Sequence, residues 1–199
     1  MITFDPATHS YKVQGVRFPS VTEIIADMGL YGDTSYFTDY CRERGHFVHR
    51  IIEWHLAGEL DEDTIDPALQ GYFDAWLRFE KEAQYVGDAC EKAMADMTHR
   101  FAGTIDLIGH LNGHYTVVDV KTGGPSPAHA LQTAGYSILL KHPGVRRFSL
   151  HLKGDGNYKL IAHKDRQDSQ VFMAALALWY WKANNLKGEG IIWQNPHFN

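Results

Sequence analysis

The chain has 199 residues, of which 44% are hydrophobic and 22% are charged, and its formal net charge is −5. No run of about 18 apolar residues is present to cross a membrane, and the N-terminal segment lacks the basic and apolar stretches of a secretory signal. Cys41 and Cys90 are the only cysteines, which excludes a secreted disulfide framework, a four-cysteine zinc site and a four-cysteine iron–sulfur cluster. We expect one domain in a reducing, intracellular environment.

The N-terminal third is predicted to hold short strands and three helices. Residues 2–18 have the composition of short strands. Ser20-Val-Thr-Glu23 then has the form of a capping box, with Gly29 suited to the end of the helix that it starts. A long helix is expected from about Ser35 to Ala57, and another from Asp66-Pro67 to about Tyr85, because an N-cap residue followed by proline favours a helix start.

The remainder is predicted to form a mixed sheet with two more helices. Three consecutive strands are followed by a helix, two further strands and a final apolar helix. Their expected ranges are 89–98, 101–111 and 114–121 for the first strands, 127–140 for the helix, 145–153 and 158–163 for the later strands, and 169–185 for the last helix. This order predicts an α/β fold with a mixed sheet.

A predicted hairpin carries the first chemical signal. Asn112-Gly113 is a favoured dipeptide for a two-residue type I′ turn, and that turn places Asp106 directly opposite Asp119. Opposed carboxylates repel each other, so a cation is expected between them. Lys121 is two residues beyond Asp119 and therefore points to the same face of the sheet.

Two acids and a lysine on one face indicate a metal site. Mg²⁺ and Mn²⁺ prefer oxygen ligands, and the carbonyl of Val120 adds a third oxygen to those of Asp106 and Asp119. A nearby lysine can orient a water or stabilise charge on a phosphate. The alternative is a surface hairpin whose aspartates are simply solvated.

Two helices carry polar residues at a spacing that puts them on one face. Gln132 and Tyr136 are four residues apart, as are His49 and Glu53. Each has an ordinary structural explanation as a solvated or core residue. The histidines His46, His49 and His55 also leave open a zinc site.

Together these motifs resemble the PD-(D/E)xK nuclease superfamily, in its RecB-like and phage-type exonuclease branch. The resemblance rests on GHFVH, FAGTID, DVK and QTAGY, in that order, and on the opening FDPATHSYKVQGVRFPSVTEII. It covers residues 1–140 closely and the last third loosely. It implies a restriction-endonuclease-like core: a helix, a three-stranded antiparallel meander, a helix and a strand, with helices flanking a central mixed sheet.

The resemblance also implies roles for individual residues. Asp106, Asp119, the Val120 carbonyl and His49 would be metal ligands, and Lys121 would be the catalytic lysine, with both aspartates part of the catalytic set. Gln132 and Tyr136 match the element that lies near the active site and helps to hold DNA. Glu91 and Glu53 stay outside this set as accessory acids, and no iron–sulfur cluster is expected.

The implied activity is Mg²⁺- or Mn²⁺-dependent hydrolysis of DNA, most simply by a phage-type exonuclease that acts in recombination or repair. The implied partners are DNA and a phage recombination protein, and the implied location is the cytoplasm of a bacterium or phage-infected cell. We expect a single nuclease domain over 1–199, with an N-terminal appendage (1–34), a catalytic core (35–165) and a C-terminal helix and tail (166–199). Alternatives are a structure-specific or sequence-independent endonuclease, a nuclease-fold protein that binds nucleic acid without catalysis, and a zinc protein.

The DNA-binding surface is expected to be basic and aromatic. Residues 141–199 contain nine Lys and Arg against four Asp and Glu, whereas residues 1–140 contain ten against twenty. A basic surface attracts a polyanion, although a solvated charged surface explains the asymmetry equally well. The candidate phosphate contacts are Lys141, Arg146, Arg147, Lys153, Lys159 and Lys164. The candidates for stacking on an unpaired base are Tyr31, Tyr36, Phe37 and Tyr40.

Overall fold

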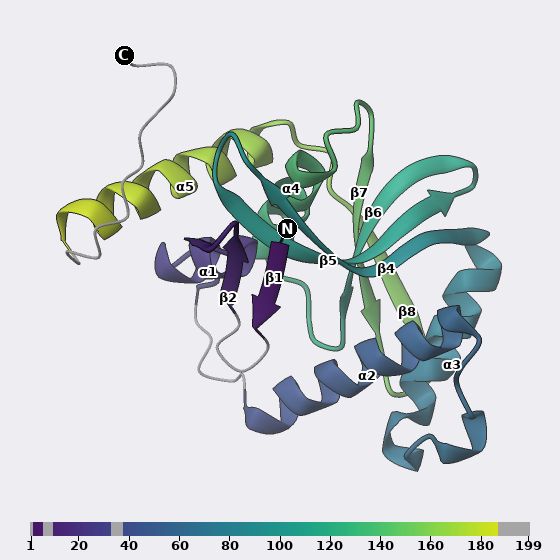
Figure 1. The fold of residues 1–199 in the computed structure, drawn as a ribbon. Coiled ribbons are helices and arrows are strands. Elements are labelled where there is room, and N and C mark those ends of the chain that lie inside the picture. The colour runs from purple at the N-terminus through teal and green to yellow at the C-terminus, as the bar shows by residue number, and fades with distance from the viewer. Residues whose placement is uncertain (1, 6–9, 33–37, 187–199) are drawn as a thin grey trace.

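The computed structural model describes residues 2–5, 10–32 and 38–186. It begins with a small antiparallel sheet of β1 (Ile2–Asp5), β2 (Ser10–Val13) and β3 (Val16–Phe18), followed by helix α1 (Val21–Asp27). The predicted capping box is present, because Ser20 accepts the Glu23 N–H at 3.0 Å and Glu23 accepts the Ser20 N–H at 3.3 Å. The small sheet and α1 precede all the strands of the main sheet in the chain (Figure 1).

The main sheet has five strands in the order β4-β5-β6-β7-β8. The strands β4 (Tyr85–Asp96), β5 (Phe101–Leu111) and β6 (His114–Lys121) form an antiparallel meander. Helix α4 (Ala128–Leu140) then leads to β7 (Arg146–Leu152), which is parallel to β6, and β8 (Tyr158–Ala162) is antiparallel to β7. The predicted α/β fold with a meander, a helix and a strand in a mixed sheet is confirmed.

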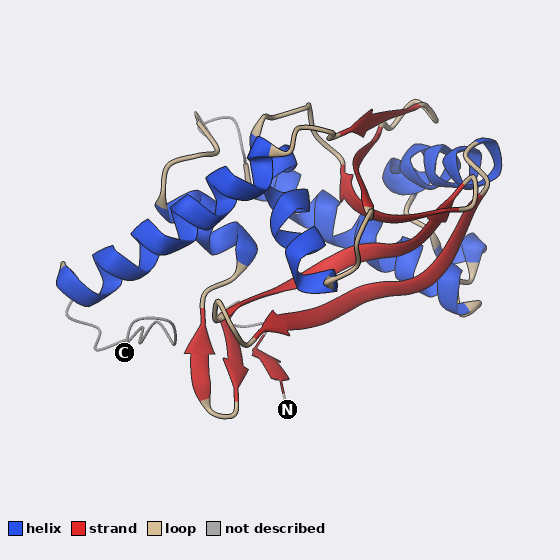
Figure 2. Cartoon of the chain, turned by 90° about the horizontal axis from the view of Figure 1, so that it is seen from above, coloured by secondary structure: helices blue, strands red, loops and turns tan. Residues whose placement is uncertain are grey.

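Helices cover both faces of this sheet (Figure 2). Helices α2 (Asp39–Ala57) and α3 (Pro67–Glu82), joined through the short 3-10 helix η1 (Glu62–Thr64), share one buried cluster with β6 and β7. Helices α1, α4 and α5 (Gln167–Asn185) share a second cluster with β5 and β6 on the other side. No helix among the described residues is long and apolar enough to span a membrane.

The sheet is distorted where β4 and β5 pass the level of Asp106. Ile105 and Leu107 are two residues apart and should share a face, yet they belong to different buried clusters. In β4, Glu91 lies between their partners Lys92 and Cys90 and has a left-handed φ of 47°. This is an uncommon conformation for a residue with a Cβ, and it marks a local bend beside Asp106.

Most predicted element boundaries agree with the structure. Asn112 and Gly113 have φ values of 48° and 75°, as a type I′ turn requires. Strand β4 begins at Tyr85, earlier than predicted, because α3 ends at Glu82. Helix α2 begins at Asp39 after the N-cap Thr38, and the predicted start at Ser35 lies outside the described residues. The division into three subdomains stays a prediction.

Candidate active site

The hairpin register is confirmed up to the level of the two aspartates. Strands β5 and β6 pair from Leu111–His114 to Leu107–Val118. The ladder ends there, one step before Asp106 and Asp119, so the predicted directly opposed pair is not part of it. Instead, Oδ2 of Asp106 accepts a hydrogen bond from the Val120 N–H at 2.7 Å. The side chain of Asp106 thus replaces a strand-to-strand hydrogen bond.

Asp119 is completely buried and only half satisfied. Its Oδ1 accepts a hydrogen bond from Nζ of Lys121 at 2.8 Å, whereas Oδ2 is buried without a hydrogen-bond partner. Burial raises the pKa of Asp119 to about 6, against the opposing charge of Lys121 and with support from the negative charge of Asp106. A buried carboxylate oxygen with no donor is costly, and a cation at this oxygen would remove that cost.

His49 projects from α2 into the same place. Its Nδ1 lies 2.9 Å from Oε1 of Glu91, and its Nε2 lies 3.1 Å from the Val120 carbonyl oxygen and 3.8 Å from Oδ2 of Asp106. Because both nitrogens face acceptors, both must carry protons. Burial alone would lower the pKa of His49, but the Asp106 and Glu91 carboxylates outweigh it and raise the pKa to about 9.

The donor set suits a divalent metal ion. His49, Glu91 and Asp106 each offer one atom, and these atoms lie within 4.8 Å of one another. The Asp119 carboxylate, whose Oδ2 is unsatisfied, is close enough to Asp106 and His49 for their charges to influence its pKa. Carboxylate oxygens and an imidazole nitrogen are a ligand set for Mg²⁺, Mn²⁺ or Zn²⁺. Without a metal ion, the doubly protonated His49 supplies the positive charge that compensates the two carboxylates it contacts.

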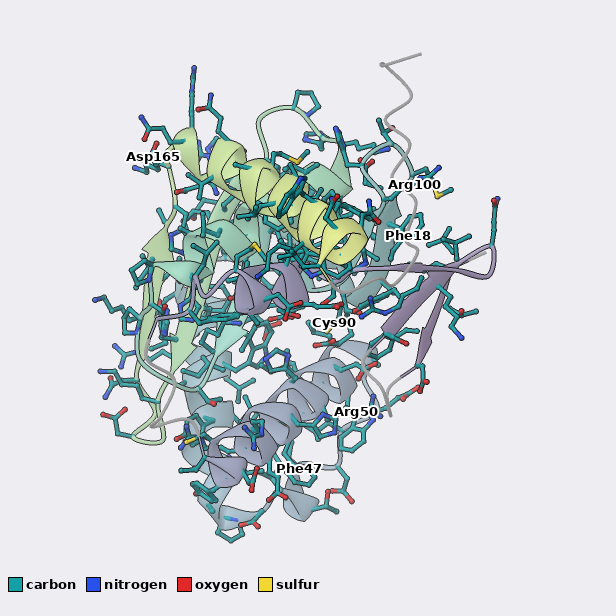
Figure 3. The ribbon with its side chains drawn as sticks, turned by 90° about the vertical axis from the view of Figure 1, so that its left-hand side faces the viewer. Phe18, Phe47, Arg50, Cys90, Arg100 and Asp165 are labelled. Atoms are coloured by element: carbon teal, nitrogen blue, oxygen red, sulfur yellow. The ribbon has the colours of Figure 1, made fainter. Side chains whose placement is uncertain are left out.

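Glu91, predicted only as an accessory acid, lies in the cluster. The β4–β5 register pairs Lys92 with Ile105 and Cys90 with Leu107, which brings Glu91 alongside Asp106. That hairpin turns through the four residues between Asp96 and Phe101, where the Arg100 N–H donates to the Asp96 carbonyl at 2.8 Å, and the sequence has no two-residue turn signal there. Glu53, the other accessory acid, instead forms an ion pair with Arg50 at 2.5 Å. In Figure 3 Cys90, next to Glu91, lies between α1 and α2.

Gln132 and Tyr136 lie beside this cluster. Nε2 of Gln132 donates to Oη of Tyr136 at 2.9 Å, and both side chains are buried. They line a cavity of about 220 Å³ together with His49, Glu91, Asp106 and Lys121. Four residues of the N-terminal element and two of β5 also line it: Tyr11, Ser20, Val21, Thr22, Gly103 and Thr104. They lie within the opening stretch and the FAGTID motif on which the resemblance rests, but no site role was predicted for them.

Only some of the six basic residues predicted to contact phosphate are exposed and unpaired with any described acid. Arg147 is buried, forms an ion pair with Asp168 at 2.8 Å and donates to two backbone carbonyls, so the prediction of a phosphate contact is wrong for it. Lys141 is exposed but pairs with Asp96 at 3.4 Å. The other four basic candidates are exposed: Arg146, Lys153, Lys159 and Lys164.

The aromatic candidates are also divided. Tyr31 is half-buried and close enough to Lys121 and Asp119 for their charges to influence its pKa, which burial raises. Tyr40 is 63% exposed on α2, with the Arg44 guanidinium over its ring. Tyr36 and Phe37 lie outside the described residues.

Comparisons with known proteins concern the family and the fold of the chain. Residues 34–189 match the model of the PD-(D/E)XK nuclease superfamily. A crystal structure from Eubacterium rectale, described as a candidate exonuclease, has 11% sequence identity and a TM-score of 0.60, and the alignment covers 88% of this chain and 83% of that one. The alkaline exonuclease LHK-Exo of Laribacter hongkongensis is 17% identical with a TM-score of 0.37, over 84% and 93% of the two chains.

No curated protein sequence is significantly similar to the chain. The family model, however, spans well over half of the 199 residues and includes the helix with His49, the meander and the helix with Gln132. The chain therefore belongs to the PD-(D/E)XK nuclease superfamily.

Proposed function

We propose that the protein is a deoxyribonuclease that hydrolyses phosphodiester bonds with Mg²⁺ or Mn²⁺, and that it degrades DNA from an end. One observation carries the proposal: the cluster of His49, Glu91 and Asp106 lines a cavity together with Lys121. The buried Asp119 contacts the same lysine, and its Oδ2 has no hydrogen-bond partner among the described residues. Nucleases of this superfamily use divalent metal ions, and this cluster has the oxygen atoms to hold one.

The metal would be held by Asp106, Asp119, the Val120 carbonyl and His49, the set predicted from the sequence, with Glu91 as an added ligand. When bound, a divalent cation neutralises charge on the scissile phosphate and makes water a stronger nucleophile. His49 would lose a proton to become a ligand, since a metal binds the neutral ring. Glu91 and Asp106 already have carboxylate oxygens beside the His49 ring.

Lys121 acts in this proposal as a fixed cation. The Asp119 and Asp106 carboxylates raise the pKa of Lys121 above its usual 10.5 in spite of burial, which alone would lower it. The ammonium group therefore stays charged at neutral pH. It orients the attacking water and stabilises the negative charge that develops on the phosphate, which is electrostatic stabilisation by a preorganised group.

Gln132 and Tyr136 form the wall of the cavity against which the nucleotide beside the scissile bond would lie. Their mutual hydrogen bond fixes the orientation of the Gln132 amide. Burial raises the pKa of Tyr136 well above 10, so its hydroxyl remains a neutral hydrogen-bonding group. Recombination or repair of DNA, with a phage-type recombination protein as partner, is the cellular role that the sequence resemblance supports.

The decisive experiment uses linear and closed circular DNA, each single- and double-stranded, and nicked double-stranded circles. Each substrate is incubated with Mg²⁺, Mn²⁺, Zn²⁺ or chelator. We expect linear DNA to be shortened progressively with Mg²⁺ or Mn²⁺ and closed circles to stay intact. Cleavage of closed circles at the same rate would make the protein an endonuclease. Binding without cleavage under every metal condition would make it a binding protein, and activity with Zn²⁺ alone would contradict the proposed metal.

A further inference from the structure

The backbone that follows Lys121 is rich in glycine, so its own residues restrict its conformation little. The segment reads Lys121-Thr-Gly-Gly, and at both Gly123 and Gly124 an added Cβ would meet nothing within 4 Å. Glycine has more conformational freedom to lose than any other residue. A lysine that must hold its ammonium group in one place is thus followed by the least restrained kind of backbone.

Side chains from two other elements hold this backbone at consecutive carbonyls. Nη2 of Arg44, on α2, donates to the Thr122 carbonyl at 3.1 Å. Nδ1 of His151, on β7, lies 2.8 Å from the Gly123 carbonyl oxygen. A carbonyl oxygen can only accept, so Nδ1 of His151 carries the proton and donates it.

His151 is placed for this contact by the sheet. It is 3% exposed, and in the parallel β6–β7 pair it is the register partner of Lys121. Register partners lie on the same face of a sheet, so the ring reaches over the end of β6 to the carbonyl two residues beyond Lys121. The contact therefore joins the chain just after the lysine to the strand beside it.

The hydrogen bonds around His151 run in one direction. Its Nδ1 donates to Gly123, so in the neutral ring Nε2 must accept from the Ser149 hydroxyl, 3.1 Å away. The Ser149 oxygen then accepts from Nε2 of His163, 3.0 Å away. Burial, the largest influence, lowers the pKa of His151 below its usual 6.5 and favours this neutral form.

We propose that His151 is a positioning residue: through its hydrogen bond to the Gly123 carbonyl it fixes the end of β6 and thereby the location of the Lys121 ammonium group. The inference rests on the proposed function in assigning Lys121 a role in the reaction. His151 is no acid or base here, because both of its ring nitrogens are engaged with Gly123 and Ser149.

Two substitutions separate the role of the two nitrogens. In His151→Asn the amide nitrogen can occupy the position of Nδ1 and keep the donor to Gly123, whereas in His151→Gln the amide extends toward the position of Nε2. We expect kcat to stay within about threefold of wild type for His151→Asn and to fall about tenfold or more for His151→Gln, because small misplacements of a reacting group are costly. KM for DNA should change less than about twofold in both.

A second measurement does not involve catalysis, so its outcome does not depend on the proposed function. Amide hydrogen exchange over residues 121–126 in the metal-free protein should be faster in His151→Gln than in His151→Asn or wild type. Thr116→Val is the matched control, since Thr116 is also buried and donates to a carbonyl, that of Gly109 at 3.2 Å, at the other end of β6. It should lower stability without slowing cleavage.

The outcomes are distinguishable. Equal kcat values and equal exchange in the Asn and Gln variants would overturn the positioning role, as would a loss of kcat in Thr116→Val that matches the loss in His151→Gln. An active Lys121→Ala variant in the same assay would overturn the role of the lysine instead. In that case faster exchange in His151→Gln would still establish the restraint on the backbone and would end its link to the reaction.

Discussion

Oδ2 of Asp106 accepts a hydrogen bond from the Val120 N–H at 2.7 Å, and the Val120 carbonyl on the other side of the same residue accepts one from His49. Both backbone groups of one strand residue are therefore bound by side chains of the site. This arrangement exists because the β5–β6 ladder ends at Leu107–Val118. The site is built where two strands part, and the charges there determine how the protein should respond to mutation, metal and pH.

Replacing Asp119 with asparagine should not destabilise the metal-free protein at pH 8. A folded pKa of about 6 against an ordinary 3.8 means that the ionised acid costs stability at higher pH, and the amide removes that cost. We expect Asp119→Asn to melt at or above the wild-type temperature in chelator, and to lose both the rise in melting temperature on metal addition and the activity. The measurement is thermal unfolding with and without Mn²⁺.

Asp96→Asn is the matched control for this variant. Asp96 is also buried, but its carboxylate accepts two backbone N–H groups at 2.8 Å. Burial alone would raise the pKa of Asp96, but these hydrogen bonds and the charges of Lys141 and His99 lower it. The Asp96→Asn protein should therefore be less stable than wild type, by about 1–3 kcal/mol. If both variants lose the same stability, Asp119 holds the fold together and does not strain it.

Lys121→Ala should abolish cleavage while metal binding persists. The lysine lies on the acid face and contacts Asp119, but an ammonium group cannot be a metal ligand. We expect less than about 1% of the wild-type rate, a loss in the range of removing one electrostatic stabiliser. Single-turnover cleavage of end-labelled linear DNA measures it, and Lys81→Ala, on the exposed surface of α3, is the control. Retention of a substantial rate contradicts the assigned role.

Glu91→Gln should weaken metal binding, whereas Glu53→Gln should not. Glu91 contacts His49 and belongs to the acidic cluster, while Glu53 is paired with Arg50. Titration calorimetry with Mn²⁺ should show an affinity at least about tenfold lower for the first variant, within the range known for groups that support a metal site. Equal affinities for the two variants would remove Glu91 from the site.

The metal-free protein should lose stability as the pH rises from about 6.5 to 9. His49 has an ordinary pKa of 6.5 in the unfolded chain and about 9 in the fold. Its contribution is complete below 6.5 and is lost as the pH passes 9, because the folded state binds the extra proton between these values. Urea unfolding in chelator measures the slope. His49→Gln should flatten it.

The local elements follow from the sequence because their signals are local. The Asn112-Gly113 turn, the Ser20 capping box and the Asp66-Pro67 helix start each depend on residues close together in the chain. Once the turn is known, the alternation of a strand puts Asp119 and Lys121 on one face. The order of motifs then indicates the superfamily, and with it the places of His49 and of the Gln132–Tyr136 pair.

The contacts that complete the site were decided by the tertiary structure alone. Glu91 reaches Asp106 only through the register of a hairpin with a four-residue turn and a left-handed residue. Arg147 looked like a phosphate ligand, but it is buried against Asp168 by the packing of α5 on α4. His151 meets Gly123 because β6 and β7 are parallel, and α4 separates them in the chain. Each contact joins residues whose proximity depends on how whole elements pack, and no short stretch of sequence encodes that.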